Sequence, residues 1–388
     1  MQNNLQSLAY FIPEITIVIT LLLAIVSDLF NEFKKYTYYL VLFGLFLTGL
    51  LLFLDSSTNV SKYLFNDMLL FDSVSYYFKC IILLSTFSII LVSQYSKELD
   101  DEYRAEYNTL LLVVLLGMFL MTNSINLIMI YLSLELVSIP SYVLAGILKN
   151  DKKSNEASLK YVIFGSFASG LMLFGFSILY GLSGTLNIYE IHAFLLNVNN
   201  PTAVLFSILL ILAGFGYKIS MVPFHYWTPD VYEGSPTTVT AFLSVAPKAA
   251  GFALMLRFFL NLFTYEGEFL SSTPLLGIEW PLLLAILSAI TMTVGNILAL
   301  RQENVKRMLA YSTISHVGFM LMAICTLTPV ALTGIAFYLL MYSFMNLSAF
   351  YMVIYMSNNY KAQTIDDWKG IAFKTPVLSA FTVLNMVS

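Results

Sequence analysis

A series of long apolar runs constrains the fold of this chain more than any other feature of its sequence. A helix needs about 20 apolar residues to cross a hydrocarbon layer of roughly 30 Å. Runs of about this size fall at 9–30, 36–54, 74–94, 109–122, 125–148, 159–181, 202–222, 236–260, 280–300, 307–327 and 330–356. Asn123, Ser124 and Asn126 interrupt the stretch 109–148 and predict two helices joined by a tight turn. The sequence therefore predicts an all-α, polytopic transmembrane helix bundle.

Two further features bear on the number of spans. The first run lacks a basic leader and a small-residue cleavage site, so we expect a retained helix and not a signal peptide. A last apolar run begins near Pro376 and stops at Ser388. The expectation is about eleven complete spans plus a truncated twelfth.

Composition excludes the other classes of protein. Only 11% of the residues are charged, against about 25% in soluble domains. The 31 Phe and 25 Tyr exclude disorder. Cys80 and Cys325 lie in apolar segments and do not form a disulfide framework. A dispersed net charge of −4 does not fit nucleic-acid binding.

The basic residues predict the orientation in the membrane. Loops after the even-numbered spans hold only Lys62. Loops after the odd-numbered spans hold Lys34, Lys35, Lys97, Arg104, Lys149, Lys152, Lys153, Arg301, Lys306, Arg307, Lys361, Lys369 and Lys374. Because cytoplasmic loops carry the excess of Lys and Arg, the odd loops are expected in the cytoplasm and the N-terminus on the opposite side.

Three ionisable residues fall at mid-depth in the predicted spans, and they are Glu135, Lys218 and Lys248. A charge at the centre of a membrane helix costs about 2.5–3.5 kcal/mol and marks a functional site by default. The alternative is a buried ion pair that only fixes helices together, although such pairs are weak evidence of stability. That alternative leaves the second lysine unexplained.

Four other charges in or near the spans have a simpler interpretation. Glu14, Asp28 and Lys79 are expected at span ends, where their side chains reach water or headgroups. Arg257 lies late in its helix and is expected to extend to the interface in the same way.

The backbone beside the mid-depth charges is also unusual. Pro140 and Pro247 each remove one helical hydrogen bond, from the carbonyls of Leu136 and Leu243. Lys218 lies in GFGYKISMVPFHYWTPDVYEGSP, which contains too many Gly and Pro residues for one continuous helix. Non-helical backbone at membrane depth is tolerated only inside protein or beside a water-filled cavity. Broken helices with ionisable residues are typical of transporters.

A lysine in this setting suits proton transfer. Burial favours its neutral form and a nearby carboxylate favours its charged form. Our hypothesis is that the distance between Glu135 and Lys218 decides whether Lys218 holds its proton, with Lys248 as the next acceptor through ordered water.

Further candidates for the relay are His225, His316 and Lys160. His225 lies beside the break and His316 inside a span, and for both a hydrogen-bonded structural role is the alternative. Lys160 follows Glu156 by four residues, so a helix ion pair and a role in cytoplasmic proton uptake both stay open. Lys306 is interpreted as a charge that sets the orientation of the chain in the membrane. It is also in position to pass protons to His316.

Motifs for resident cofactors do not occur in the sequence. It has no cysteine array for an iron–sulfur cluster, no Walker loop and no GxGxxG between a strand and a helix. Any redox cofactor is therefore expected on another chain.

Three segments carry a resemblance to a known family. GYKISMVPFHYWTPDVYEGSPTTVTAFLSVAPKAAGF, YLSLELVSIPSYVLAG and RQENVKRMLAYSTISHVGFML resemble the antiporter-like membrane subunits of respiratory complex I, and most of all the subunit N family, whose mitochondrial counterpart is subunit 2. The resemblance implies that a Glu pairs with a Lys on a broken helix and that protons pass to the next Lys. The matching positions are Glu135, Lys218 and Lys248.

The resemblance also implies the wider context. The enzyme would oxidise NADH, reduce a quinone and export protons. NADH, FMN, iron–sulfur clusters and quinone would be bound by other subunits, and this chain would carry no cofactor. Its partners would be other membrane subunits and the lipid bilayer, in a bacterial inner membrane. In the family, a further Lys lies on a broken twelfth helix, which this sequence does not complete.

Under this interpretation residues 1–388 form a single transmembrane domain. Three N-terminal helices occupy 1–108, the proton-channel helices occupy 109–260 with a broken helix near 214–236, and a second helix group occupies 280–388. The main alternative is a multisubunit cation/proton antiporter without redox activity, and a third is a membrane scaffold with inert ion pairs.

Overall fold

The computed structural model describes residues 4–30, 33–54, 61–196, 201–265, 268–269, 280–326, 328–377, 379–380 and 383. Within these residues, 11 helices are long and apolar enough to cross a membrane. They are built on α2 (Ile12–Leu29), α3 (Thr37–Leu54), α4 (Ser73–Ser93), α5 (Arg104–Asn123), α6 (Leu127–Ala145), α7 (Lys152–Ser183), α9 (Pro201–Ile219), α11 (Thr237–Phe263), α12 (Trp280–Ala299), α13 (Val305–Thr326) and α14 (Pro329–Tyr360). The predicted number and order of complete spans are confirmed. The predicted twelfth helix lies largely outside the described residues.

Short elements connect the spans, and the apolar runs did not predict them. The helical ones are α1 (Asn4–Ala9), η1 (Lys34–Tyr36), α8 (Ile188–Leu195), α10 (Trp227–Gly234), η3 (Asp366–Trp368) and α15 (Ile371–Lys374). Strand β1 (Lys62–Leu64) pairs antiparallel with β2 (Leu69–Phe71), with Lys62 opposite Phe71. Strand β3 (Thr264–Tyr265) pairs in the same way with β4 (Glu268–Phe269).

Polar side chains begin several of the helices. The Asn126 side chain accepts a hydrogen bond of 3.0 Å from the Ile128 amide and caps α6, at the turn that the sequence predicted. Asp72 caps α4 by accepting a bond of 2.8 Å from the Ser75 amide, and the Ser75 hydroxyl accepts one from the Asp72 amide. These bonds satisfy amide groups that a helix leaves unpaired in its first turn.

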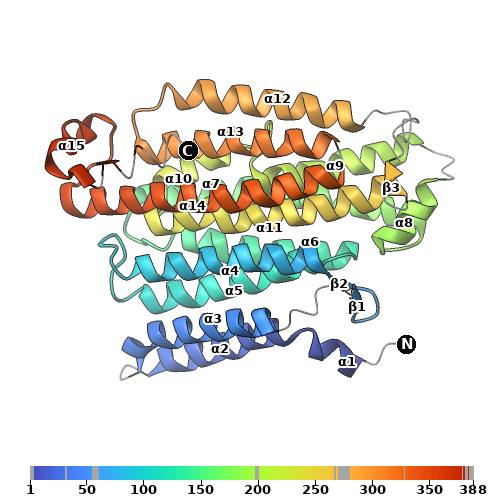
Figure 1. The fold of residues 1–388 in the computed structure, drawn as a ribbon, viewed down its shortest axis with the longest axis horizontal. Coiled ribbons are helices and arrows are strands. Elements are labelled where there is room, and N and C mark those ends of the chain that lie inside the picture. The colour runs from blue at the N-terminus through green and yellow to red at the C-terminus, as the bar shows by residue number, and fades with distance from the viewer. Residues whose placement is uncertain are drawn as a thin grey trace.

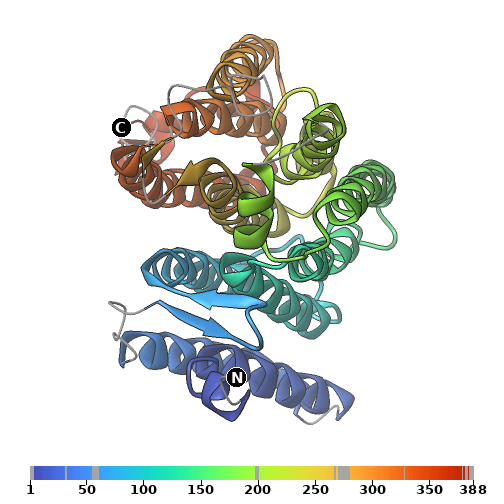
Figure 2. The same ribbon diagram turned by 90° about the vertical axis from the view of Figure 1, so that its right-hand side faces the viewer.

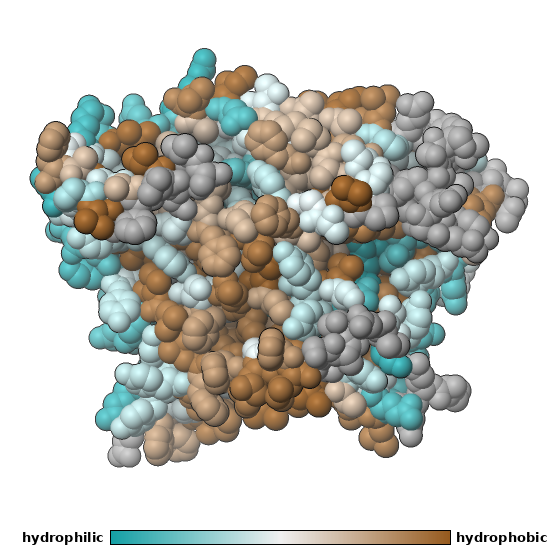
Figure 3. Space-filling view, viewed as in Figure 1, coloured by the Kyte–Doolittle hydropathy of each residue, from teal (hydrophilic) through white to brown (hydrophobic). Residues whose placement is uncertain are grey.

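The spans run side by side in layers (Figure 1). Helices α2 and α3 pack together and against α4 and α5, whereas α12 packs on α13 at the opposite side of the molecule. Seen nearly along the helices, strands β1 and β2 lie at one end, between the N-terminal pair and the next layer (Figure 2). Brown residues gather over the middle of the helices and teal residues at the two ends (Figure 3), as expected for a protein that crosses a bilayer.

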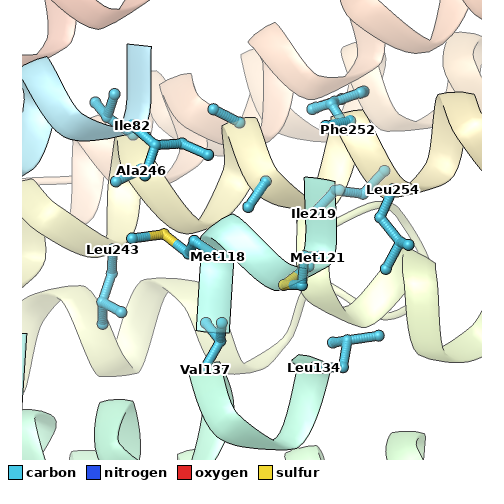
Figure 4. Close-up of a cluster of buried hydrophobic side chains, with 14 of the residues drawn as sticks. Ile82, Met118, Met121, Leu134, Val137, Ile219, Leu243, Ala246, Phe252 and Leu254 are labelled. Atoms are coloured by element: carbon cyan, nitrogen blue, oxygen red, sulfur yellow. The ribbon is translucent and has the colours of Figure 1, made fainter. Parts of the chain in front are cut away.

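Helix α11 forms the centre of the bundle. It packs against α4, α5, α6, α9, α13 and α14. Its most apolar stretch of 18 residues is entirely buried. Leu243, Ala246 and Phe252 of α11 belong to the same buried apolar cluster as Met118 of α5 and Val137 of α6 (Figure 4). Helix α11 also carries Lys248, so this lysine is buried at the centre of the bundle.

Close packing of α12 on α13 gives a test of the fold. A Cβ at Gly318 would lie 2.7 Å from the Met292 backbone nitrogen, whereas a Cβ at Gly334 would meet nothing within 4 Å. We expect Gly318→Ala to destabilise the protein by about 1–3 kcal/mol through overpacking, and Gly334→Ala to be neutral. Thermal unfolding of the purified complex measures both, and equal midpoints for the two variants would contradict this packing.

Candidate proton-transfer site

The break predicted in the helix that bears Lys218 is present. Helix α9 ends at Ile219, and the chain passes through Ser220 with φ of 68° and a cis Val222–Pro223 bond before α10 begins at Trp227. The Met221 amide donates back to the Gly216 carbonyl at 2.7 Å. A positive φ at a residue other than glycine costs about 1–3 kcal/mol and is concentrated at functional sites. The break leaves the Ile219 carbonyl outside the helical hydrogen-bond ladder.

Lys248 is bonded to this break. Its Nζ donates to the Ser220 Oγ at 2.8 Å and to the Ile219 carbonyl at 3.3 Å. Thr228 of α10 donates to the same Ser220 Oγ at 2.7 Å, so one hydroxyl joins both sides of the break to α11. The rings of Trp227 and Tyr232 lie 6.0 and 5.8 Å from the Lys248 Nζ. Helix α11 continues through Pro247 without a break.

Lys218 occupies the last turn of α9 and is buried. Its Nζ donates to the Ser138 Oγ of α6 at 3.0 Å, and Ser138 in turn donates to the Leu134 carbonyl at 2.8 Å. A Cβ at Gly251 would lie 3.0 Å from Ile219 and 3.4 Å from Lys218, so the end of α9 packs directly on α11 there.

Glu135 of α6 lies beside α7. It is half-buried and lines an open pocket of about 530 Å³ together with Tyr131, Tyr142 and Ser166. Among the ion pairs of the described residues, none within 4.0 Å joins Glu135 to Lys218, so the pairing that the family resemblance implies is not formed in this structure. The physical reason is Ser138, one helical turn further along α6, whose hydroxyl binds the amine instead.

The two histidines have different surroundings. His225 is buried in the break, with its ring 4.5 Å from that of Tyr226. His316 of α13 shares a hydrogen bond of 2.7 Å with the Tyr338 hydroxyl of α14. The ring of Tyr342 lies 5.2 Å from His316, and its hydroxyl donates to the Ser244 carbonyl at 3.1 Å, one turn before Lys248. These contacts of Tyr342 were not predicted, because an aromatic residue in a span carries no signal of its partners.

A cluster of charges surrounds the end of α10. Lys160 contacts Glu156 at 2.7 Å, as predicted, and also Asp230 at 2.7 Å. Arg307 contacts the other oxygen of Asp230 at 2.6 Å. Burial acts to raise the pKa of the Asp230 carboxyl, but the hydrogen bonds and charges of Lys160 and Arg307 outweigh it and hold that pKa below its usual range. Asp230 thereby fastens α10 to both α7 and α13.

Lys306 does not point toward His316. Its Nζ donates to the Ser235 carbonyl at 2.8 Å, between α10 and α11, and this contact contradicts the suggestion that it supplies His316. It adds a further tie between α13 and the segment after the break.

Three of the charges assigned to span ends do not reach water or headgroups. Glu14 and Lys79 have no exposed side-chain surface and face each other with Nζ and Oε1 2.6 Å apart. Arg257 is buried and donates to the Thr122 carbonyl at 2.9 Å and to Asp72 at 2.7 Å. The predictions for these three residues are wrong, because partners on other helices replace water. Asp28 is partly exposed beside Lys34, as expected for a span end.

Comparison with known proteins agrees with this geometry. The profile of the NADH:quinone oxidoreductase/Mrp antiporter transmembrane family matches residues 124–388. NADH-quinone oxidoreductase subunit N 2 of Chloroherpeton thalassium is 43% identical over 386 residues, which cover 97% of this chain and 74% of that protein. A chain of respiratory complex I from Thermus thermophilus, solved with bound aureothin, has a TM-score of 0.75 at 28% identity and covers 96% of this chain and 77% of its own.

A more distant structure shares the fold alone. A chain of the Mrp complex from Dietzia sp. DQ12-45-1b has a TM-score of 0.79 at 20% identity, over 96% of this chain and 69% of that one. The fold and the family match thus define an antiporter-like, multi-pass membrane subunit. The chain belongs to the NADH-quinone oxidoreductase subunit N family.

Asp230 gives a test of the charge cluster. We expect Asp230→Asn to destabilise the protein by about 1.5–3 kcal/mol, because it weakens two hydrogen bonds to charged groups. Since the pKa of Asp230 is held low, this contribution is present above the unfolded-state value of about 3.9 and is lost as the pH falls through the lower folded value.

Thermal unfolding of the purified complex at a series of pH values measures the effect. Glu233→Gln is the matched control, since Glu233 contacts Arg307 and Lys153 only at 3.2 Å. A loss of thermal stability in Asp230→Asn no larger than in Glu233→Gln would refute the contribution assigned to Asp230.

Proposed function

We propose that this chain is a proton-translocating membrane subunit of NADH:quinone oxidoreductase, in which NADH oxidation and quinone reduction drive proton export. Membership of the subunit N family supports the enzyme. The single observation that carries the proton role is the Lys248 amine, which is buried in the central helix and bonded to Ile219 and Ser220 where a helix breaks.

The two buried lysines suit a relay of protons. Each Nζ is hydrogen-bonded to a hydroxyl, Lys218 to Ser138 and Lys248 to Ser220. A hydroxyl both donates and accepts, so it stays bonded when the amine changes from charged to neutral. Ile219, whose carbonyl binds Lys248, directly follows Lys218 in the chain, so a movement of the end of α9 alters both amines together.

The proposed role of Glu135 is to bias Lys218 by its charge. Glu135 borders an open pocket between α6 and α7, and its side chain is accessible from that pocket. A conformational or electrostatic change that arrives from a neighbouring subunit would act on Glu135 first and would alter the proton affinity of Lys218. Coupling is then a shift between two states of different proton affinity. His225, His316 and Lys160 are proposed as further members of the relay.

The remaining context is part of the same proposal. The subunit would assemble with other membrane subunits of complex I in the lipid of a bacterial inner membrane, and the complex would use a quinone as substrate. NADH, FMN and iron–sulfur clusters would be held by other subunits, with none on this chain. A multisubunit cation/proton antiporter is the alternative, and its support is a shared fold at 20% identity.

Replacing the buried lysines tests the proposal. In inverted membrane vesicles that contain the whole complex, we expect Lys218→Met and Lys248→Met to lower NADH-driven proton uptake by about 100-fold or more, because each removes a positioned proton carrier. Glu135→Gln should lower it in the same direction. A pH-sensitive dye reports uptake, and the amount of assembled complex is measured in parallel.

Lys369→Met is the matched control, since Lys369 is an exposed lysine paired only with its neighbour Asp366. Unchanged proton uptake in Lys218→Met or Glu135→Gln, with normal assembly, would refute the relay. Cation movement without NADH in the purified complex would favour the antiporter instead.

The proposed orientation has its own test. Single cysteines are placed at Lys62 and Lys152 after Cys80 and Cys325 have been replaced by Ser. We expect a membrane-impermeant thiol reagent to label the Lys62→Cys variant in right-side-out vesicles and the Lys152→Cys variant in inverted ones, because basic loops stay in the cytoplasm. The reverse pattern would overturn the assignment of the N-terminus to the non-cytoplasmic side.

A further inference from the structure

A second pair of buried ionisable groups lies outside the relay of Lys218 and Lys248. Glu14 of α2 and Lys79 of α4 approach to 2.6 Å, and both side chains are fully buried. They join the N-terminal helix pair to the layer of α4 and α5, at the lower part of the bundle in Figure 1. Neither residue belongs to the proposed relay.

The hydrogen-bonding groups of this pair are poorly satisfied for an ion pair that only holds helices together. Glu14 Oε1 accepts a long hydrogen bond of 3.4 Å from the side-chain Nδ2 of Asn123. Glu14 Oε2 has no hydrogen-bond partner among the described residues. The other sides of the Lys79 ammonium face the rings of Phe71 and Phe119, at 5.4 and 5.6 Å. Apolar residues of similar volume often hold helices together as well as a buried ion pair does. A fully buried ionisable pair in a membrane protein is therefore a candidate for function.

Polar groups connect this pair to the central helix. Asn123 follows Thr122 in α5, and the Thr122 carbonyl accepts a bond of 2.9 Å from Arg257 of α11. Arg257 also contacts Asp72, the residue that caps α4, at 2.7 Å. Residues of α2, α4, α5 and α11 thus form one polar group, and α11 is the helix that carries Lys248.

We propose that Glu14 and Lys79 form a second proton-transfer site, which changes between an ion pair and a neutral pair during turnover. In this step an N–H bond of the Lys79 ammonium breaks and an O–H bond forms on the Glu14 carboxylate, so the net charge of the pair stays zero and no other reactant is needed. Arg257, Thr122 and Asn123 connect the change to α11. This inference rests on the proposed function, because it extends the proton path of the same subunit.

A double substitution separates a proton role from a structural one. Glu14→Leu combined with Lys79→Met removes both charges and keeps the site apolar, so the complex is expected to assemble in normal amounts. We expect NADH-driven proton uptake in inverted vesicles to fall about tenfold or more. Uptake equal to that of the wild type, at normal assembly, would overturn the inference and leave the pair a structural contact.

Two comparisons complete the experiment. Asp28→Asn combined with Lys34→Met removes a partly exposed pair at the end of the same helix α2, and it should leave proton uptake unchanged. Lys248→Met is measured alongside. If Lys248→Met loses uptake while the Glu14/Lys79 variant keeps it, the proposed function stands and only this inference fails. If Lys248→Met keeps uptake, the proposed function itself fails.

Infrared spectroscopy covers the case in which the double variant does not assemble. Glu14→Gln keeps the shape of the side chain but has no ionisable proton. The wild-type complex is expected to show, on addition of NADH, a carbonyl band of a protonated carboxylic acid that shifts in D₂O and is missing in Glu14→Gln. The same band in both proteins would contradict a proton on Glu14.

Discussion

The free energy of keeping an ammonium group away from water is the constraint on which the rest of this structure depends. A lysine at membrane depth is tolerated only when other groups replace its hydration. The end of α9 supplies them, because the carbonyl of Ile219 and the hydroxyl of Ser220 face Lys248 where the helix stops. The break and the buried lysine therefore explain each other, and the close packing of α11 on α9 at Gly251 holds them together.

Much of the fold follows from the sequence alone, because a bilayer demands long apolar helices. The apolar runs located every complete span, and Asn123, Ser124 and Asn126 located the turn between α5 and α6. The Gly and Pro residues of 214–236 predicted a broken helix in this segment, and the structure places the break after Ile219. The short strands escaped prediction because three-residue pairings in a loop leave no periodic pattern.

The burial of Lys218 and Lys248 was predicted, but their contacts were not. Position along the chain identified Lys218 and Lys248, but only the fold brings Ser138 to Lys218 from 80 residues away. The same limit explains the error for Glu14 and Lys79, which looked like span ends and became partners when α2 packed beside the other helices. Asp230 gave no signal either, because its two cationic partners come from α7 and α13.

Ordered water between the two buried amines is the most direct test of the central claim, that protons move through this subunit beside the broken helix. Electron cryo-microscopy of the whole complex, at a resolution that shows water, is the measurement. We predict a chain of hydrogen-bonded water between the Nζ atoms of Lys218 and Lys248, past Ser138 and Ser220, in at least one state of turnover. A dry apolar contact between the two amines in every state would contradict the account.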